Sequence, residues 1–337
     1  MAQYLEVKME FMNRKFEESM VYNSDYTIIG IDGGGTHTRG VLYQKGKFIA
    51  EANTGTSRIH TVGVGEACER TLNIIQDLCN KSEIESSEID AIVVGLAGVW
   101  LDEEKKRAAT LLRTLARSNR MIINDVSVVS DAEIAYEGAL NGDDGIIMIV
   151  GTGSIGLARI SKGKFIRCGG WGIELDDEGS GAWIGKEALT AIVRHIDGRG
   201  KQTKLTEAFA NKFKSVDLKN PRTIVKAYAD GVFVYSQLSP IAMELAEGGD
   251  EIALEIINRA AYHLAELPQT LLSNFKSKKV KVAMMGGIIH NSTLLARKIE
   301  EILSENSIYE IVKVPSDVAL WGAISIGLKM IESSKEL

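Results

Sequence analysis

The pattern of apolar and polar positions predicts alternating strands and helices from residue 26 onward. Short apolar segments separated by glycine-containing turns predict three strands in an antiparallel meander, at residues 26–32, 37–43 and 47–52. The expected elements that follow are a helix at 62–79, a strand at 89–97, a helix at 103–116 with Asp102 as candidate N-cap, a strand at 121–124 and a helix at 130–140.

The same order of elements is predicted again from residue 145. Its members are strands at 145–150, 155–161 and 164–168, a long helical stretch at 181–275 broken near Gly198, Pro221 and Gly248–Gly249, a strand at 279–285, a helix at 291–303, a strand at 309–314 and a closing helix at 318–331. A chain of 337 residues is long enough for two domains of ~150 residues. We therefore expect an α/β protein with two similar lobes around an inter-lobe cleft, the natural place for a ligand.

We place the N-terminal lobe at 25–142 and the C-terminal lobe at 143–337, with the last helix free to pack back on the first lobe. Residues 1–24 form an N-terminal extension with apolar residues at helical spacing, which fits either an amphipathic helix or a frayed tail. Few prolines and no Ser/Gly-rich linker indicate lobes that hinge against each other rather than tumble on a tether.

Composition excludes several classes of function. The net charge of −6 gives no global field that would attract nucleic acid or an anionic membrane. The longest nearly apolar run, 91–101, is too short to cross a bilayer, and the charged N-terminus does not resemble a secretory signal. The three cysteines, Cys68, Cys79 and Cys168, have neither zinc-knuckle nor redox-motif spacing. We expect reduced thiols in a cytoplasmic protein.

A glycine turn follows the first predicted strand. In the sequence Asp32-Gly33-Gly34-Gly35-Thr36, the glycines let the backbone approach a polyanion with its amides turned inward. Asp32, at the end of the strand, is a candidate ligand for Mg²⁺ through water. The alternative interpretation is an ordinary tight hairpin.

Two more glycine turns occur in the second half. Gly151-Thr152-Gly153-Ser154 lies at the position equivalent to the first turn, which suggests two loops that bind one triphosphate. Gly286-Gly287 follows a late buried strand and could lie against a flat adenine base, or could be an ordinary strand-to-helix turn.

Asp131 is the candidate general base. It lies where a short strand passes into a helix, in the sequence Ser130-Asp131-Ala132. A carboxylate there can accept the proton of an alcohol as phosphoryl transfer proceeds. The alternative is a helix N-cap formed by Ser130 or Asp131.

A segment suited to a sugar comes next. Gly169-Gly170-Trp171-Gly172 precedes Asp176-Asp177-Glu178. An indole can cover the C–H face of a pyranose while carboxylates accept hydrogen bonds from its hydroxyls. The alternatives are a core tryptophan and the polar start of a helix.

Together these motifs resemble the actin-like ATPase superfamily, which includes sugar kinases. The closest resemblance is to the N-acetylglucosamine kinase group of the BadF/BadG/BcrA/BcrD ATPase family, from about Tyr26 to the C-terminus. The resemblance implies two ribonuclease H-like lobes, transfer of the γ-phosphoryl group of Mg-ATP to a sugar hydroxyl, and a homodimer. It also implies that Thr36 and Thr152 face the phosphates, that Asp131 is the base, and that the acceptor contacts Ser154, Gly170, Trp171, Gly172 and Asp177.

The chain departs from the family pattern in one place. Where the family usually offers an asparagine to the sugar, this sequence has Arg58, with His60 two residues later. Arginine binds carboxylates bidentately, so an anionic acceptor such as 2-keto-3-deoxygluconate or N-acetylmuramate is an alternative. The other interpretation is that Arg58 points into solvent.

Two further readings of the resemblance stay open. Relatives in this family are ATPases that activate 2-hydroxyacyl-CoA dehydratases through an iron–sulfur cluster, which needs thiolate ligands. Cys168 stands beside the Gly169–Gly172 sugar segment, and Cys68 and Cys79 lie on one predicted helix, so no cysteine is in the glycine-rich setting expected of a cluster ligand. A sugar-sensing regulator is the third reading, but residues 1–24 are too short for a DNA-binding helix pair.

Overall fold

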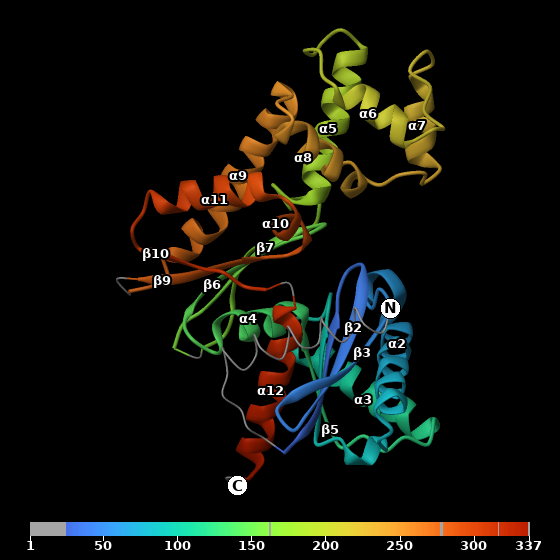
Figure 1. Ribbon diagram of the computed structural model, residues 1–337, viewed down its shortest axis with the longest axis vertical. Coiled ribbons are helices and arrows are strands. Elements are labelled where there is room, and N and C mark those ends of the chain that lie inside the picture. Colours follow the sequence, from blue (N-terminus) through green and yellow to red (C-terminus); the bar gives the residue numbers. More distant parts are fainter. Residues whose placement is uncertain (1–24, 162, 277–278, 316, 336–337) are drawn as a thin grey trace. The chain divides into compact units, whose positions relative to one another are not determined.

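The chain folds into two compact units (Figure 1). The computed structural model describes residues 25–161, 163–276, 279–315 and 317–335. The first unit extends to Gly142 and resumes at Asp317, and the second comprises residues 143–316. The final helix therefore belongs to the first unit, so the second unit ends before it and not at residue 337. The expected N-terminal extension, 1–24, lies outside the described residues.

The first unit is a three-layer α/β/α structure. Its elements are β1 (Thr27–Gly33), β2 (His37–Gln44), β3 (Lys47–Gly55), α2 (Ile59–Ser82), the 3₁₀ turn η1 (Ser86–Glu88), β4 (Ala91–Leu96), α3 (Asp102–Ser118), β5 (Asp125–Ser130), α4 (Asp131–Leu140) and α12 (Val318–Lys335). The sheet order is β3-β2-β1-β4-β5, with β1, β4 and β5 parallel.

Both faces of this sheet are buried, which explains why β4 is apolar on both sides. On one face Ile29 and Ile31 pack with Ile75 of α2 and Leu112 of α3. On the other face the side chains pack with α12 and α4, for example Ile28 with Ile324.

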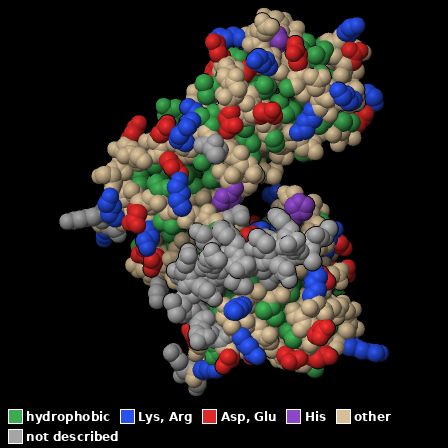
Figure 2. Space-filling view, in the orientation of Figure 1, with side chains coloured by type: hydrophobic (Ala, Val, Ile, Leu, Met, Phe, Trp, Pro, Cys, Tyr) green, Lys and Arg blue, Asp and Glu red, His purple; other side chains and the backbone are tan. Residues whose placement is uncertain are grey.

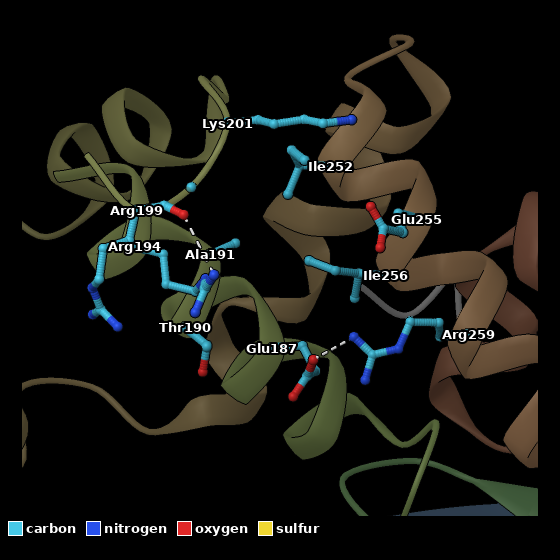
Figure 3. A pocket seen from close by; sticks show the side chains of 11 residues that line it. Glu187, Thr190, Ala191, Arg194, Arg199, Lys201, Ile252, Glu255, Ile256 and Arg259 are labelled. Atoms are coloured by element: carbon cyan, nitrogen blue, oxygen red, sulfur yellow. Dashed lines mark hydrogen bonds and ion pairs between the residues drawn. The ribbon is translucent and has the colours of Figure 1, made fainter. Parts of the chain in front are cut away.

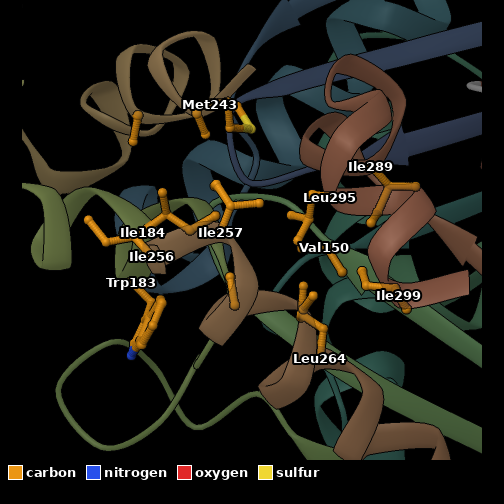
Figure 4. Packing of buried hydrophobic residues seen from close by; sticks show 14 of the residues in the cluster. Val150, Trp183, Ile184, Met243, Ile256, Ile257, Leu264, Ile289, Leu295 and Ile299 are labelled. Atoms are coloured by element: carbon orange, nitrogen blue, oxygen red, sulfur yellow. The ribbon is translucent and has the colours of Figure 1, made fainter. Parts of the chain in front are cut away.

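The second unit also contains a five-stranded sheet, ordered β10-β9-β6-β7-β8. Its elements are β6 (Gly145–Val150), β7 (Ser154–Arg159), β8 (Ile166–Gly169), α5 (Gly181–Ile196), α6 (Leu205–Lys212), α7 (Arg222–Ala229), the 3₁₀ turn η2 (Tyr235–Gln237), α8 (Ser239–Glu247), α9 (Glu251–Leu272), β9 (Val280–Met285), α10 (Gly287–Asn291), α11 (Thr293–Ser304) and β10 (Tyr309–Val312). Figure 4 shows its core, in which Val150, Ile184, Ile257 and Leu295 join strand β6 to the covering helices.

Two local expectations are wrong. Residues 121–124 do not form a strand, because the strand that pairs with β4 is residues 125–130, in register from Ala91↔Asp125 to Leu96↔Ser130. Asp102 is not the N-cap of α3 but its first residue. Leu101 occupies the cap position, and its amide donates to Glu104 Oε2 at 2.9 Å.

The surface of the chain carries both signs of charge. Figure 2 shows basic and acidic side chains interspersed over the face in view. No helix among the described residues is long and apolar enough to span a membrane.

Candidate active site

In the first unit, parallel strand pairing brings Asp32 and Asp131 to one edge of the sheet. Asp32 is in register with Gly95 of β4, and Leu96 of β4 is in register with Ser130, directly before Asp131. The carboxyl ends of β1, β4 and β5 therefore meet at the same edge. The approach is close, since a Cβ on Gly95 would lie 3.3 Å from Asp131 Cα. In α/β sheets this is the edge where ligands bind.

The first glycine turn is a hairpin with an exposed tip. The Gly34 amide donates to the His37 carbonyl at 3.1 Å, and Gly35 and Thr36 are exposed. A Cβ on buried Gly33 would lie 2.7 Å from Leu96 Cδ2 and 2.8 Å from the Gly95 carbonyl oxygen. The hairpin interpretation is thus correct for the backbone, and the exposed tip still leaves room for a ligand.

Asp32 is held by a basic residue that the sequence interpretation missed. Arg39 of β2 donates to Asp32 Oδ2 at 3.1 Å and to Asp317 Oδ1 at 2.7 Å. Burial raises the pKa of Asp32, and the Arg39 charge opposes that rise. The second oxygen, Oδ1, lies toward Gly34, where an added Cβ would come within 3.9 Å of it. The predicted meander would allow Asp32 and Arg39 to be recognised as cross-strand partners. It could not predict the contact of Arg39 with Asp317, which is distant in sequence.

Asp131 is the first residue of α4 and does not cap it. Ser130 is the N-cap: its Oγ accepts from the Glu133 amide at 3.1 Å, and Glu133 Oε2 accepts from the Ser130 amide at 2.6 Å. Asp131 Oδ1 accepts from the Ala132 amide at 2.9 Å. Because this capping box is complete without Asp131, the N-cap interpretation holds for Ser130 alone.

The environment makes Asp131 a stronger base than an ordinary aspartate. Burial, with a smaller contribution from the Asp32 charge, raises the pKa of Asp131 to about 6. The Arg58 charge and the Ala132 amide oppose that rise in pKa. A carboxyl group with a pKa near neutrality suits general base catalysis.

Arg58 and His60 face different surroundings. Arg58 is exposed at the N-cap of α2, near enough to Asp131 to affect its pKa. Its backbone is fixed because Thr56 Oγ1 donates to the Gly34 carbonyl at 3.1 Å and accepts from the Arg58 amide at 3.1 Å. His60 instead lies against Gly98, where an added Cβ would be 3.0 Å from its Cδ2. Gly98 follows the carboxyl end of β4, so both residues lie near this edge, and Arg58 is the one whose charge affects the pKa of Asp131.

In the second unit, the loop at 151–153 is bonded to the start of α5. The Gly151 carbonyl accepts from the Gly181 amide at 2.9 Å, and the Thr152 carbonyl accepts from the Ala182 amide at 3.0 Å. The Gly151 amide donates to the Gly153 carbonyl at 2.9 Å, which closes the turn.

Asp177 lies directly on this loop. A Cβ on Gly153 would be 2.6 Å from Asp177 Oδ2, and the Gly172 amide donates to Asp177 Oδ1 at 3.2 Å. Ser154 Oγ donates to the Glu178 carbonyl at 3.0 Å. The second glycine loop and the predicted sugar segment therefore form one continuous structure. Asp177 is buried and has a φ of 56°, a left-handed conformation that a non-glycine residue seldom adopts.

Trp171 is a surface residue and not a core one. Its side chain is 67% exposed, and the Arg167 guanidinium lies 4.0 Å from the ring centroid. Gly170 precedes it with a φ of 76°. The core-tryptophan interpretation is wrong, and one ring face is occupied by a cation–π contact.

The third glycine turn contacts the end of β6. Gly286 has a φ of 107°, and a Cβ there would lie 2.3 Å from the Val150 carbonyl oxygen. Gly287 begins α10. Val150 immediately precedes the 151–153 loop, so the two glycine turns of this unit are neighbours.

Among the described residues, one group of three side chains could hold a metal ion, namely Glu178, His263 and Glu266. His263 Nδ1 lies 3.3 Å from Glu266 Oε2 and 3.6 Å from Glu178 Oε2. This arrangement is also that of a surface ion pair, and the sequence interpretation did not find it.

The model of the BadF/BadG/BcrA/BcrD ATPase family matches residues 29–325. The chain belongs to this family. Two of its three cysteines do not favour the branch that activates dehydratases, because Cys68 and Cys79 are buried in the first unit and burial raises the pKa of the Cys68 thiol to about 11.

The relatives of this ATPase-family chain include curated sugar kinases. It is 31% identical over 307 residues to the N-acetylmuramic acid/N-acetylglucosamine kinase of Clostridium acetobutylicum, covering 89% of this chain and 97% of that protein. It is 29% identical over 293 residues to the N-acetyl-D-glucosamine kinase of Dictyostelium discoideum, covering 82% and 90%.

Solved structures of proteins assigned as sugar kinases have the same fold as this chain. One from Chromobacterium violaceum, provisionally assigned as an N-acetylglucosamine kinase, aligns with a TM-score of 0.68 and 23% identity over 89% of this chain and 99% of that one. A ROK family glucokinase from Streptomyces griseus aligns with a TM-score of 0.58 and 16% identity over 90% and 99%. The predicted α/β fold class with two similar units is confirmed.

Proposed function

We propose that this protein is an ATP-dependent sugar kinase that phosphorylates a hydroxyl of N-acetylglucosamine or a related amino sugar. The observation that carries the proposal is the position of Asp131, a half-buried carboxyl at the sheet edge where the first glycine turn begins, with burial raising its pKa to about 6. The curated relatives, named as kinases of N-acetylmuramic acid and N-acetylglucosamine, support the reaction type.

In this proposal the two glycine loops bind the ATP phosphates. The Gly34 and Gly151 amides close their own turns, so the amides offered to phosphate oxygens are those of Gly35, Thr36, Thr152 and Gly153, together with the two threonine hydroxyls. Gly286 and Gly287, whose turn lies next to the second loop, are proposed to contact the adenosine. Amides fixed before the reaction stabilise charge that develops on the transferring group.

Magnesium fits the carboxylates of the first unit. Mg²⁺ is usually held by one or two carboxylates together with substrate phosphates and water. Asp32 is the candidate carboxylate: it lies at the sheet edge that also carries Asp131, and its Oδ1 faces the glycine turn. Asp32 would hold the ion through water, and the ion would neutralise charge on the phosphates when bound.

Asp131 acts on the acceptor in this scheme. Its carboxylate accepts a hydrogen bond from the sugar hydroxyl, orients that oxygen toward the γ-phosphorus and takes its proton as the P–O bond forms. Ser154, Gly170, Trp171, Gly172 and Asp177 are proposed to bind the sugar, with the exposed indole against its C–H face. ADP leaves with the electron pair of the broken bond.

The reaction is tested by measuring ADP release over a panel of neutral, amino and acidic sugars with a no-sugar control. We expect release that depends on an amino sugar. Release at the same rate without sugar would support an ATPase instead, and no release with any sugar would support a sensor.

The rate should depend on pH through Asp131. Because the base must be ionised, kcat/KM is expected to rise with pH and level off above a midpoint of about 6. Arg58→Ala removes a charge that lowers the pKa of Asp131, so its midpoint should move to higher pH, whereas Arg58→Lys should stay near the wild type. A profile that is flat between about pH 5 and 7 would contradict the assignment of Asp131.

The position of Arg58 supports a second candidate for the acceptor substrate, an acidic amino sugar such as N-acetylmuramate. Its exposed guanidinium lies near Asp131, and the name of the Clostridium relative includes N-acetylmuramic acid. A charge-assisted bond to the acceptor's carboxylate would favour that sugar.

Kinetics with both sugars test the role of Arg58. We expect Arg58→Ala to raise KM for N-acetylmuramate about tenfold or more and to change KM for N-acetylglucosamine much less. Arg58→Lys should give an intermediate KM for N-acetylmuramate, because lysine keeps the positive charge but lacks the planar guanidinium that binds a carboxylate through two hydrogen bonds. Equal changes in KM for the two sugars would contradict the proposal that Arg58 binds the carboxylate of the acceptor. That result would not affect the proposal that the protein is a sugar kinase.

A further inference from the structure

A pocket lies between two helices of the second unit, lined by α5, α9 and the chain that follows α5 (Figure 3). Its volume is about 300 Å³. No residue of the phosphate or sugar segments lines it. The volume lies at the lower end of the range for small-molecule sites, which favours a compact ligand.

Helical spacing explains why the pocket is open. Glu187, Ala191 and Arg194 share one face of α5, and Ile252 and Ile256 share the facing side of α9. Ala191 is small, so the two helices leave a hollow where larger residues would meet. The isoleucines form an apolar floor, of which Ile256 is fully buried.

A tight turn brings basic residues over one end of this floor. After α5 the amides of Arg199 and Gly200 both donate to the Arg194 carbonyl at 2.9 Å. A Cβ on Gly200 would lie 3.0 Å from Arg194 Cβ, so the turn is folded closely on α5. The Arg194 side chain donates to the Arg199 carbonyl at 3.4 Å. The Lys201 side chain extends across the pocket, and its ammonium group ends over α9 (Figure 3).

The charges around the pocket favour an anion. Four of the lining residues are basic and two are acidic, although the whole chain has a net charge of −6. One acidic residue, Glu187, already pairs with Arg259 at 2.7 Å, and Arg259 also lies 5.1 Å from the Trp183 ring centroid. Arg194 and Lys201 have no carboxylate within ion-pair distance among the described residues, whereas Arg199 pairs with Asp197 at 2.6 Å. Glu255 is the other acidic lining residue, so the unpaired charges of Arg194, Lys201 and Glu255 leave the pocket with a small net positive charge.

We propose that this pocket binds a small organic phosphate, a phosphate monoester on a compact body such as a sugar ring. Arg194 supplies a planar fork to the phosphate, and Lys201, which reaches across the pocket from the turn after α5, adds a second positive charge. Ala191, Ile252 and Ile256 cover an apolar face of the body. The proposal does not depend on the kinase reaction.

The test is calorimetric titration of the full chain with glucose 6-phosphate, in the presence of saturating Mg²⁺ and a non-hydrolysable ATP analogue. Glucose and inorganic phosphate are titrated as comparison ligands. We expect glucose 6-phosphate to bind and the double variant Arg194→Ala/Lys201→Ala to weaken its binding about tenfold or more. The matched control, Arg222→Ala/Lys226→Ala, removes the same charge from exposed positions of α7 and should bind as the wild type does.

A second variant tests the floor. Ala191→Leu fills the hollow and should abolish binding of glucose 6-phosphate without removing any charge. Unchanged affinity in the Arg194→Ala/Lys201→Ala variant would overturn the proposal, because the phosphate would then bind elsewhere. It would also be overturned if glucose bound as tightly as its phosphate, or if inorganic phosphate matched glucose 6-phosphate.

Discussion

Replacing Asp131 by asparagine is expected to lower kcat about 10²- to 10⁴-fold while the affinity for ATP stays near that of the wild type. The substitution keeps the size of the side chain and removes the proton acceptor. Glycine-turn amides, and not Asp131, are proposed to bind the nucleotide. Single-turnover phosphoryl transfer and nucleotide binding, measured on the same preparation, separate the two effects.

A cap variant is the matched control for the Asp131 experiment. Ser130→Ala removes the Oγ that accepts from the Glu133 amide but leaves the carboxylate of Asp131 in place. It should cost about 1 kcal/mol of stability and retain most of the transfer rate. If Asp131→Asn turned over at the wild-type rate, the assignment of the general base would be wrong.

The substitution Gly138→Ala is expected to lower the free energy of unfolding by about 3 kcal/mol or more, the upper range for overpacking. Gly138 of α4 lies at the crossing with α12, where an added Cβ would be 1.8 Å from the Val318 carbonyl oxygen. Gly322 faces it, with an added Cβ 1.8 Å from the Ile134 carbonyl oxygen. Backbone atoms on both sides leave no flexible side chain that could yield.

Urea unfolding measures this effect. Gly65→Ala in α2 is the control, since an added Cβ there meets no atom within 4 Å and should gain about 0.5–1 kcal/mol. Because Asp131 begins α4, Gly138→Ala should also reduce kcat. Stability equal to that of the wild type would show that the two helices do not pack as closely as described.

The duplicated pattern predicted most of the fold because the local periodicity of apolar residues indicates the type and order of the helices and strands. Both meanders, the buried strand β4 and the helical region after Gly181 follow from the spacing of apolar residues. The prediction of a strand at 121–124 is wrong because the apolar residues Met121 and Ile123 pack at the edge of the core without joining the sheet.

The candidate site was predictable where backbone requirements leave a sequence signature. Glycine occurs where the backbone or a side chain of another segment comes close, as at Gly33, Gly153 and Gly286. The Ser130-x-x-Glu133 spacing predicts a capping box that does not require the Asp131 side chain. Long-range partners leave no such signature.

The contact of Arg39 with Asp317 joins residues 278 positions apart. Similarly, Glu137 of α4 is buried against Ser325 and Lys329 of α12, 188 and 192 positions later. These side-chain contacts depend on where α12 packs, and composition and spacing do not determine that position.

The most direct test is a crystal structure of the Asp131→Asn variant with Mg²⁺, a non-hydrolysable ATP analogue and N-acetylglucosamine. The proposal predicts that Gly34–Thr36 and Gly151–Gly153 both contact the phosphates of one nucleotide. It also predicts that the side chain at position 131 lies within hydrogen-bond distance of a sugar hydroxyl facing the terminal phosphate. Phosphates bound by one loop alone, or a sugar hydroxyl out of reach of position 131, would contradict it.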